Sequence, residues 1–238
     1  MENFLTPLIH QEKLNQDKII SLIGAGGKTT LLYQLGQLLS TKKNILLTTT
    51  THMAYPDHLD SSQIITEENI IDFPKNQSLL FLGKPEGHKV ASLSHDFLYE
   101  ALSYYDQMIV EADGSKRLPA KIKNTTEPVI LKDCSCVIQV VGLSALNHPI
   151  EDVLFRYPIA CEVFDLNKET MLTIDLLKEI LLYNFNNIDC EKKILLFNQI
   201  DQVDLTQIEP YFKDFPYPVY YSSLKNNILK GGQPSDHL

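Results

Sequence analysis

The chain has 238 residues, 44% of them hydrophobic and 21% charged, and 21 Lys and Arg against 30 Asp and Glu give a formal net charge of -9. This acidic balance disfavours non-specific nucleic-acid binding and electrostatic attachment to anionic lipid, because both need a basic surface. The sequence lacks an apolar run near the roughly 20 residues of a membrane span, a signal-peptide pattern and the cysteine density of a disulfide scaffold. We therefore expect a reduced, cytoplasmic protein with neither nucleic acid nor a membrane as partner.

Apolar runs rich in β-branched residues alternate with amphipathic stretches, which is typical of a mostly parallel sheet flanked by helices. Strands are predicted at Ile19–Ile23, Asn44–Thr49, Leu79–Leu82, Gln107–Ala112, Cys136–Val141, Lys193–Phe197 and Pro218–Tyr221. Helices are predicted at Thr29–Leu39, His95–Tyr104, Ile174–Tyr183 and, on a weaker pattern, Leu205–Phe212. We expect one three-layer α/β domain over residues 1–238, with a helical elaboration at 142–191 and a flexible tail at 230–238.

The first predicted strand runs into a glycine-rich loop, and a helix follows at once: Gly24, Ala25, Gly26, Gly27, Lys28, Thr29 and Thr30. Inward-pointing N–H groups of such a loop bind phosphate, assisted by the helix N-terminus. Lys28 is expected on the β- and γ-phosphates and the Thr29 hydroxyl on Mg²⁺. The usual spacing requires glycine where Leu22 stands, so the loop fits a shorter frame, as in some ligases and kinases. The alternative is a tight turn with a solvated lysine, but the order of strand, loop, Lys-Thr pair and helix favours nucleotide binding.

The second predicted strand ends in a run of hydroxyl side chains followed by a histidine. Ligands of open parallel sheets lie at the carboxyl ends of strands. Thr50 would orient Mg²⁺-bound water, Thr51 would contact phosphate, and His52 would act as a base or reach phosphate. The alternative is a strand that ends in β-branched residues, with His52 in a turn.

An acidic pair ends the strand at Gln107–Ala112. Glu111 and Asp113 lie on the same face of the extended chain, where a Walker B carboxylate would hold Mg²⁺ or orient the attacking water. Both are candidate catalytic residues with Lys28, and Asp113 is a candidate metal ligand. Which of the two serves Mg²⁺ stays open.

Basic residues follow this acidic pair. Lys116, Arg117 and Lys121 would clamp phosphate or a second anionic substrate, or else form a solvated face. Arg156 would stabilise transferring phosphate or form a structural ion pair.

A later strand ends in Asn198-Gln199-Ile200-Asp201. Guanine-binding P-loop proteins carry Asn-Lys-x-Asp at this place, and here Gln199 replaces the lysine. Ser223, after the next strand, falls where such proteins support the base. Asp201 and Ser223 therefore favour GTP slightly over ATP, although Asn-x-x-Asp is also a common helix cap.

Taken together, the chain resembles the YqeC family, accessory proteins of selenium-dependent molybdenum hydroxylases. The matching blocks are Gly24–Leu32, Leu47–His52, Val110–Lys121, Glu127–Ile130, Val140–Leu146 and Asn198–Asp201. The resemblance implies a P-loop NTPase-like fold and a role in making or inserting a selenium cofactor. It also implies molybdenum hydroxylases or selenium-cofactor assembly proteins as partners. It assigns Lys28 and Thr29 to phosphate and Mg²⁺, and makes Asp113, Lys116 and Lys121 site candidates.

The leading hypothesis is a Mg²⁺-dependent NTPase that assists maturation of such a hydroxylase. One alternative is a small-molecule phosphotransferase or ligase-like enzyme. Another is a non-catalytic chaperone or switch whose nucleotide only orders loops.

Overall fold

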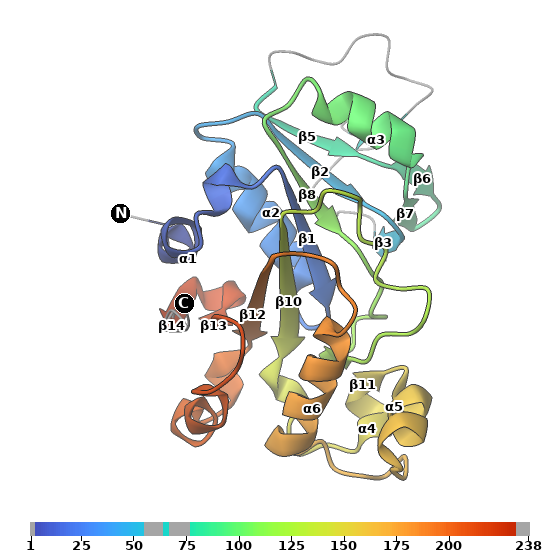
Figure 1. Cartoon of the computed structure of the whole chain (residues 1–238), viewed down its shortest axis with the longest axis vertical. Helices are drawn as coiled ribbons and strands as arrows, with labels where there is room; N and C mark the ends of the chain where they lie inside the picture. Colours follow the sequence, from blue (N-terminus) through green and yellow to red (C-terminus); the bar gives the residue numbers. More distant parts are fainter. Residues whose placement is uncertain (1–2, 55–63, 67–76, 232–238) are drawn as a thin grey trace. The chain divides into compact units, whose positions relative to one another are not determined.

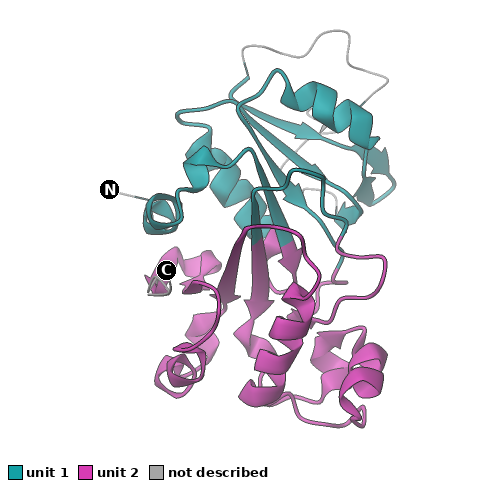
Figure 2. Cartoon of the chain, in the orientation of Figure 1, with its two compact units in different colours: residues 1–22, 29–114, 129–137 teal, residues 23–28, 115–128, 138–238 magenta. Residues whose placement is uncertain are grey.

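The structure is a computed structural model that describes residues 3–54, 64–66 and 77–231 (Figure 1). It is an α/β protein with a large, mostly parallel central sheet, compatible with three layers. The chain divides into two compact units (Figure 2). The first comprises residues 1–22, 29–114 and 129–137, and the second comprises 23–28, 115–128 and 138–238. A single domain over the whole chain stays a prediction.

Parallel strands of the first unit lie in the order β1-β8-β2-β5-β4. Every residue of β1, β2 and β8 is buried, as in a parallel sheet with both faces covered. These strands are β1 (Ile19–Gly24), β2 (Ile45–Thr49), β4 (Ile64–Ile65), β5 (Leu79–Leu82) and β8 (Gln107–Glu111). A small antiparallel sheet contains β3 (His52–Ala54), β6 (Lys84–Glu86) and β7 (Lys89–Ala91).

The register of β1, β8 and β2 places the ends of these three strands next to one another, and each end carries different side chains. Glu111 of β8 lies opposite Leu22 of β1 on one side and opposite Thr49 of β2 on the other. Leu22 is two residues before the first loop glycine, and Thr49 is the second residue of the polar run that begins at Thr48. The acidic strand end therefore lies between the strand that enters the glycine loop and the threonine-rich strand.

Two of the helices, α3 and α6, begin at a residue whose side chain caps the first turn. The Ser94 hydroxyl accepts a hydrogen bond from the Phe97 N–H at 3.3 Å and caps α3. Thr173 does the same for α6 through the Leu176 N–H at 3.3 Å. The helices are α1 (Thr6–Gln11), α2 (Lys28–Leu39), α3 (His95–Leu102), α4 (Ile150–Val153), α5 (Tyr157–Phe164) and α6 (Ile174–Phe185).

Strands of the second unit lie in the order β14-β13-β12-β10. The pair β12–β13 is parallel and the pair β13–β14 is antiparallel. The bounds are β10 (Cys136–Gly142), β12 (Lys192–Asn198), β13 (Val219–Ser223) and β14 (Ile228–Gly231), and the short strands β9 (Ala120–Lys121) and β11 (Leu154–Phe155) pair with each other in parallel. Helices α4, α5 and α6 all lie within 142–191.

Each of the seven predicted strands is present within one or two residues, as are the helices α2, α3 and α6. The helix predicted at Leu205–Phe212 is wrong, since this segment forms two short 3₁₀ helices, Leu205–Gln207 and Glu209–Phe212. Pro210 lacks an N–H, and proline disfavours the helical conformation of the residue before it. The tail predicted from residue 230 is wrong for Lys230 and Gly231, which end β14; the rest of it, 232–238, lies outside the described residues.

Candidate functional site

The glycine loop of the second unit is a close-packed backbone turn. Gly24 and Gly26 have φ angles of +91° and +76°, which glycine adopts readily. A Cβ at Gly24 would lie 2.2 Å from the carbonyl oxygen of Val140, and one at Gly26 would lie 2.3 Å from the backbone nitrogen of Gly142. The Ala25 N–H donates to the Val140 carbonyl at 2.9 Å. The loop is therefore fixed against the end of β10 and has no room for side chains at these glycines.

Asn198, at the end of β12, holds the same loop from a second side. Its Nδ2 donates to the carbonyl oxygen of Gly26 at 2.7 Å, and its Oδ1 accepts from the Leu224 N–H at 3.0 Å. A Cβ at Gly27, where φ is +140°, would lie 2.4 Å from this Nδ2. Asn198 is thus a positioning residue for the loop, whatever base a nucleotide carries.

The Lys28 side chain folds back over the glycine loop that precedes it. Its Nζ donates to the carbonyl oxygen of Gly24 at 2.6 Å, and the residue is 3% exposed. The loop amides and this ammonium lie in one short segment of the second unit, which is the arrangement that a polyphosphate requires. Thr30, two residues further along α2, is exposed.

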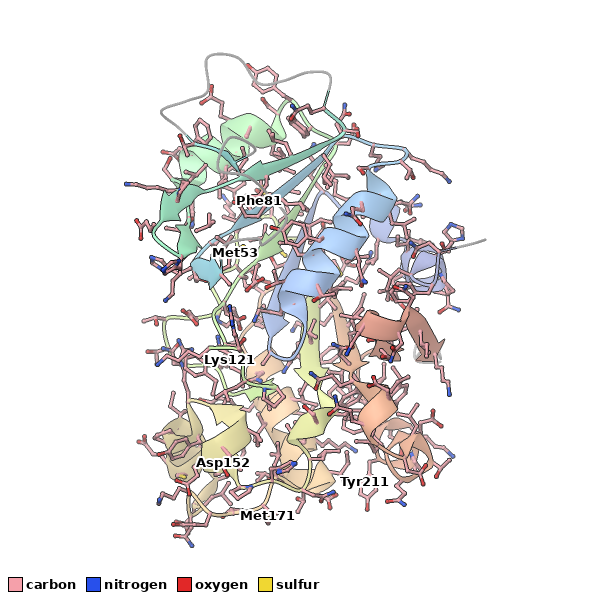
Figure 3. All side chains as sticks on the ribbon, turned by 180° about the vertical axis from the view of Figure 1, so that it is seen from behind. Met53, Phe81, Lys121, Asp152, Met171 and Tyr211 are labelled. Carbon is pink, nitrogen blue, oxygen red and sulfur yellow. The ribbon has the colours of Figure 1, made fainter. Side chains whose placement is uncertain are left out.

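In the first unit, Thr29 contacts the acidic strand end. The Thr29 hydroxyl donates to Glu111 Oε2 at 2.7 Å, and Glu111 is 5% exposed. Tyr33 follows one helical turn after Thr29, and its ring stacks on that of Phe81, which is labelled in Figure 3; the ring centroids are 6.2 Å apart. Burial, and secondarily the Glu111 carboxylate, raise the pKa of Tyr33, so this phenol stays protonated at neutral pH.

The contact between Thr29 and Glu111 fits a magnesium ion in its donor chemistry. Mg²⁺ prefers oxygen ligands and is usually held by one or two carboxylates together with substrate phosphates. Among the described residues, no group of three or more His, Cys, Asp or Glu side chains is placed to hold a metal ion. A Mg²⁺ ion here would therefore depend on the Thr29 hydroxyl, on a carboxylate and on phosphate oxygens.

The threonine run after β2 packs around the end of β8. The Thr49 hydroxyl and the Thr50 N–H both donate to the Glu111 carbonyl, at 2.9 and 3.2 Å. The Thr50 hydroxyl donates to the carbonyl oxygen of Val129 at 2.7 Å, which leaves its lone pairs for another partner. The Thr51 hydroxyl is buried and has no hydrogen-bond partner within the described part of the chain. The roles of Thr50 and Thr51 toward Mg²⁺ and phosphate stay predictions.

His52 lies on the small antiparallel sheet of the first unit. Its Nε2 is 3.3 Å from Glu86 Oε2, and its side chain is 57% exposed. Its role as a base or phosphate contact stays a prediction.

Asp113, two residues beyond Glu111, is 2% exposed. Binding of Mg²⁺ by Glu111 or by Asp113 likewise stays a prediction, with both carboxylates as candidates.

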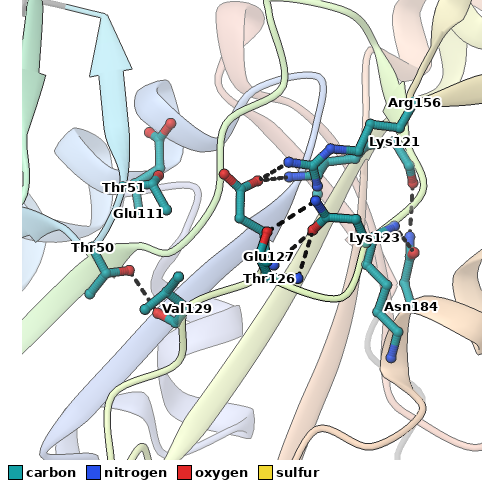
Figure 4. Close-up of polar contacts among 12 residues, drawn as sticks. Thr50, Thr51, Glu111, Lys121, Lys123, Thr126, Glu127, Val129, Arg156 and Asn184 are labelled. Carbon is teal, nitrogen blue, oxygen red and sulfur yellow. Dashed lines mark hydrogen bonds and ion pairs between the residues drawn. The ribbon is translucent and has the colours of Figure 1, made fainter.

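Two basic residues of the second unit, Lys121 and Arg156, share a carboxylate partner that the local sequence pattern did not indicate, Glu127. Lys121 Nζ and Arg156 Nη2 both donate to Glu127 Oε2, at 2.9 and 2.8 Å (Figure 4). Burial alone would raise the pKa of Glu127, but the hydrogen bonds and charges of Lys121 and Arg156 outweigh it and lower this pKa below its usual value. The interpretation of Arg156 as a member of a structural ion pair is confirmed. Lys116 and Arg117 are exposed and have left-handed φ angles of 49° and 64°.

The candidate base-reading residues contact one another in the second unit. Asp201 Oδ1 accepts from the Ser223 hydroxyl at 2.5 Å, and Asn226 Nδ2 donates to the same hydroxyl at 2.8 Å. Gln199 Oε1 accepts from the Ser144 hydroxyl at 2.6 Å. Asp201 and Ser223 are thus joined by a direct hydrogen bond, and their role toward a base stays a prediction.

Sequence reasoning missed Tyr33 and Glu127. Tyr33 had a usable signal, because it lies four residues after Thr29 on the same helix face. Glu127 begins a block that matches the family, but the local pattern did not indicate its ion pairs, because its partners are six and 29 residues away and come from β9 and from the residue after β11.

Comparisons with known proteins show which family this chain is similar to. A family model described as "YqeC protein" matches residues 20–158. Over 142 residues the chain is 34% identical to "Uncharacterized protein YqeC" of Escherichia coli (strain K12), which covers 56% of this chain and 54% of the relative. The chain thus spans about half the length of this curated relative. No solved structure matches, and none of the described helices has the length and apolar character needed to cross a membrane. Because the family model covers more than half of the residues, the chain belongs to the YqeC family.

Proposed function

We propose that this protein binds a nucleoside triphosphate on its glycine loop and hydrolyses it with Mg²⁺, within a P-loop NTPase-like fold. The observation that carries the proposal is the loop Gly24–Lys28, where glycines with no room for a Cβ precede a lysine that returns over the loop backbone. Such a turn between a buried strand and a helix presents backbone N–H groups and a cation together, which is the requirement of a polyphosphate.

The chemistry would depend on placement and electrostatics. The loop N–H groups and Lys28 would bind the β- and γ-phosphates and neutralise charge that develops during transfer. When bound, Mg²⁺ would neutralise phosphate charge further. The Thr29 hydroxyl and the Glu111 carboxylate are the groups of the first unit that would hold it, with Asp113 as the second candidate carboxylate.

The base preference is proposed to be guanine. A carboxylate accepts hydrogen bonds from N1–H and the 2-amino group of guanine, which adenine cannot donate. Asp201 is oriented by the Ser223 hydroxyl, and this contact favours a fixed carboxylate over a mobile one.

The resemblance of the motif blocks supports a cellular role for this activity. We infer that nucleotide turnover assists maturation of selenium-dependent molybdenum hydroxylases in the cytoplasm. A cell that lacks this chain and expresses such a hydroxylase should regain hydroxylase activity with the wild-type chain but not with the Lys28→Ala variant. Equal recovery by both chains would contradict a role for nucleotide in maturation.

Isothermal titration calorimetry with GTP or ATP and Mg²⁺ tests nucleotide binding directly. Lys28→Ala removes the ammonium on the loop and should abolish measurable affinity. Lys42→Ala is the matched control, because it removes an exposed lysine just beyond the end of the same helix. Unchanged affinity of Lys28→Ala would overturn the proposal, as would the absence of binding to the wild-type chain.

A further inference from the structure

Three cationic side chains of the second unit surround one aromatic ring. The Lys116 and Lys121 ammonium groups lie 5.6 Å from the centroid of the Phe155 ring, and the Arg156 guanidinium carbon lies 5.0 Å from it. The parallel pairing of β9 with β11 sets this arrangement, because it places Lys121 opposite Phe155. The negative face of the ring attracts a cation, but the ring carries no net charge to balance three of them.

The cluster also holds an unsatisfied donor. Glu127 accepts from Lys121 and from Nη2 of Arg156, while Nη1 of Arg156 is buried and has no hydrogen-bond partner among the described residues. A buried guanidinium nitrogen left unpaired is costly, and native proteins usually supply a partner. Lys116 is exposed, so the cluster can be reached from solution on its side.

We propose that Lys116, Lys121 and Arg156 form a binding site for an oxyanion of the phosphate type, free or carried by a small molecule. A guanidinium presents planar N–H donors to such oxygens, and ammonium groups add charge without a fixed direction. Glu127 keeps Lys121 and Arg156 in place and leaves Nη1 of Arg156 for the anion. The chain has a net charge of -9, so a cluster of three cationic side chains is unusual in it. An anion-binding site would explain this cluster.

The loop that carries these cations also contacts the glycine loop. The Pro119 carbonyl oxygen accepts from the Gly142 N–H at 2.8 Å and lies 2.7 Å from where a Cβ of Gly26 would be. A phosphate on the cationic cluster is therefore either the terminal phosphate of a nucleotide or that of a second substrate beside it. The site itself does not depend on the proposed nucleotide binding.

The test uses the full chain and inorganic phosphate, titrated calorimetrically at constant ionic strength so that general screening does not change. The wild-type chain should bind phosphate saturably. Arg156→Gln and Lys116→Gln should each weaken this binding by about tenfold or more, as expected for a lost hydrogen bond or charge on an anion. Glu127→Gln keeps a side-chain oxygen that can accept from Lys121 and Arg156 but removes a negative charge that competes with the anion, so it should strengthen this binding. Lys168→Gln is the matched control, because Lys168 is an exposed lysine of the same unit that pairs with Glu151 at 2.9 Å.

A purely structural cluster predicts a different pattern, in which Arg156→Gln and Glu127→Gln both lower thermal stability and neither changes phosphate affinity. That pattern, or the absence of saturable binding to the wild-type chain, overturns the proposal. Lys116→Gln keeps the test decisive if Arg156→Gln fails to fold, because Lys116 is exposed. Two further titrations identify the source of the phosphate. A nucleotide phosphate requires Arg156→Gln to weaken GTP and inorganic phosphate together, whereas a second substrate requires phosphate to bind Lys28→Ala as it binds the wild-type chain.

Discussion

Replacing Asn198 with alanine should destabilise the second unit and loosen the glycine loop. Two backbone groups lose their side-chain partner, the carbonyl oxygen of Gly26 at 2.7 Å and the N–H of Leu224 at 3.0 Å. Leu224 is 2% exposed, so loss of the buried hydrogen bond to its N–H should cost about 1–3 kcal/mol, and the loss at Gly26 adds about 1 kcal/mol. The expected loss is therefore about 2–4 kcal/mol of unfolding free energy.

Urea unfolding followed by far-UV circular dichroism measures this loss. With a slope of about 2–3 kcal/mol per molar urea, the midpoint should fall by about 1 M. Asn226→Ala is the control, because this exposed asparagine donates to the Ser223 hydroxyl and should cost less than about 0.5 kcal/mol. Amide exchange over residues 23–28 should also accelerate in Asn198→Ala alone. A midpoint shift no larger than that of the control would refute the view that Asn198 fixes the loop.

Three further predictions concern single contacts. Glu127 has a lowered pKa, so its ionised carboxyl stabilises the fold above about pH 4.5, and this contribution disappears as the pH falls through the lowered pKa. Glu127→Gln should flatten the acid limb of thermal stability against pH, and an unchanged limb would contradict the ion-pair account. Thr29→Val removes the 2.7 Å hydrogen bond to Glu111 and should reduce the effect of Mg²⁺ on nucleotide affinity by about tenfold; an undiminished Mg²⁺ effect would argue against metal binding there. Asp201→Asn offers an N–H₂ donor where guanine also donates, so preference should move from GTP toward xanthosine triphosphate by about tenfold, and unaltered preference would exclude base reading by Asp201.

The strands and main helices were predictable because their patterns are local. β1, β2 and β8 are buried throughout and consist largely of apolar residues. In the segment Leu205–Phe212 the local apolar pattern does not determine the secondary structure. Its apolar spacing resembles a helix, but Pro210 and the Asp204 carboxylate, which accepts from the Thr206 N–H at 3.1 Å, favour short turns instead.

The glycine loop and its lysine were predictable for the same local reason, whereas the partners of the site were not. Asn198 is 172 residues from the glycine whose carbonyl it contacts. The strand order brings such residues together, and no periodicity within either segment encodes that contact. The sequence alone identified residue types that suit nucleotide binding. The structure shows which contacts they make: Asn198 donates to the glycine loop, and Asp201 accepts from Ser223.

The block Val110–Lys121 gains a physical explanation from these contacts. Its acidic residue Glu111 ends β8 and meets the Thr29 hydroxyl, while its last residue, Lys121, forms the ion pair with Glu127. Between them the chain carries Lys116 in a left-handed conformation to the Phe155 ring, although a non-glycine residue adopts that conformation at a cost. An anion bound to this segment, as proposed above, would offset this cost.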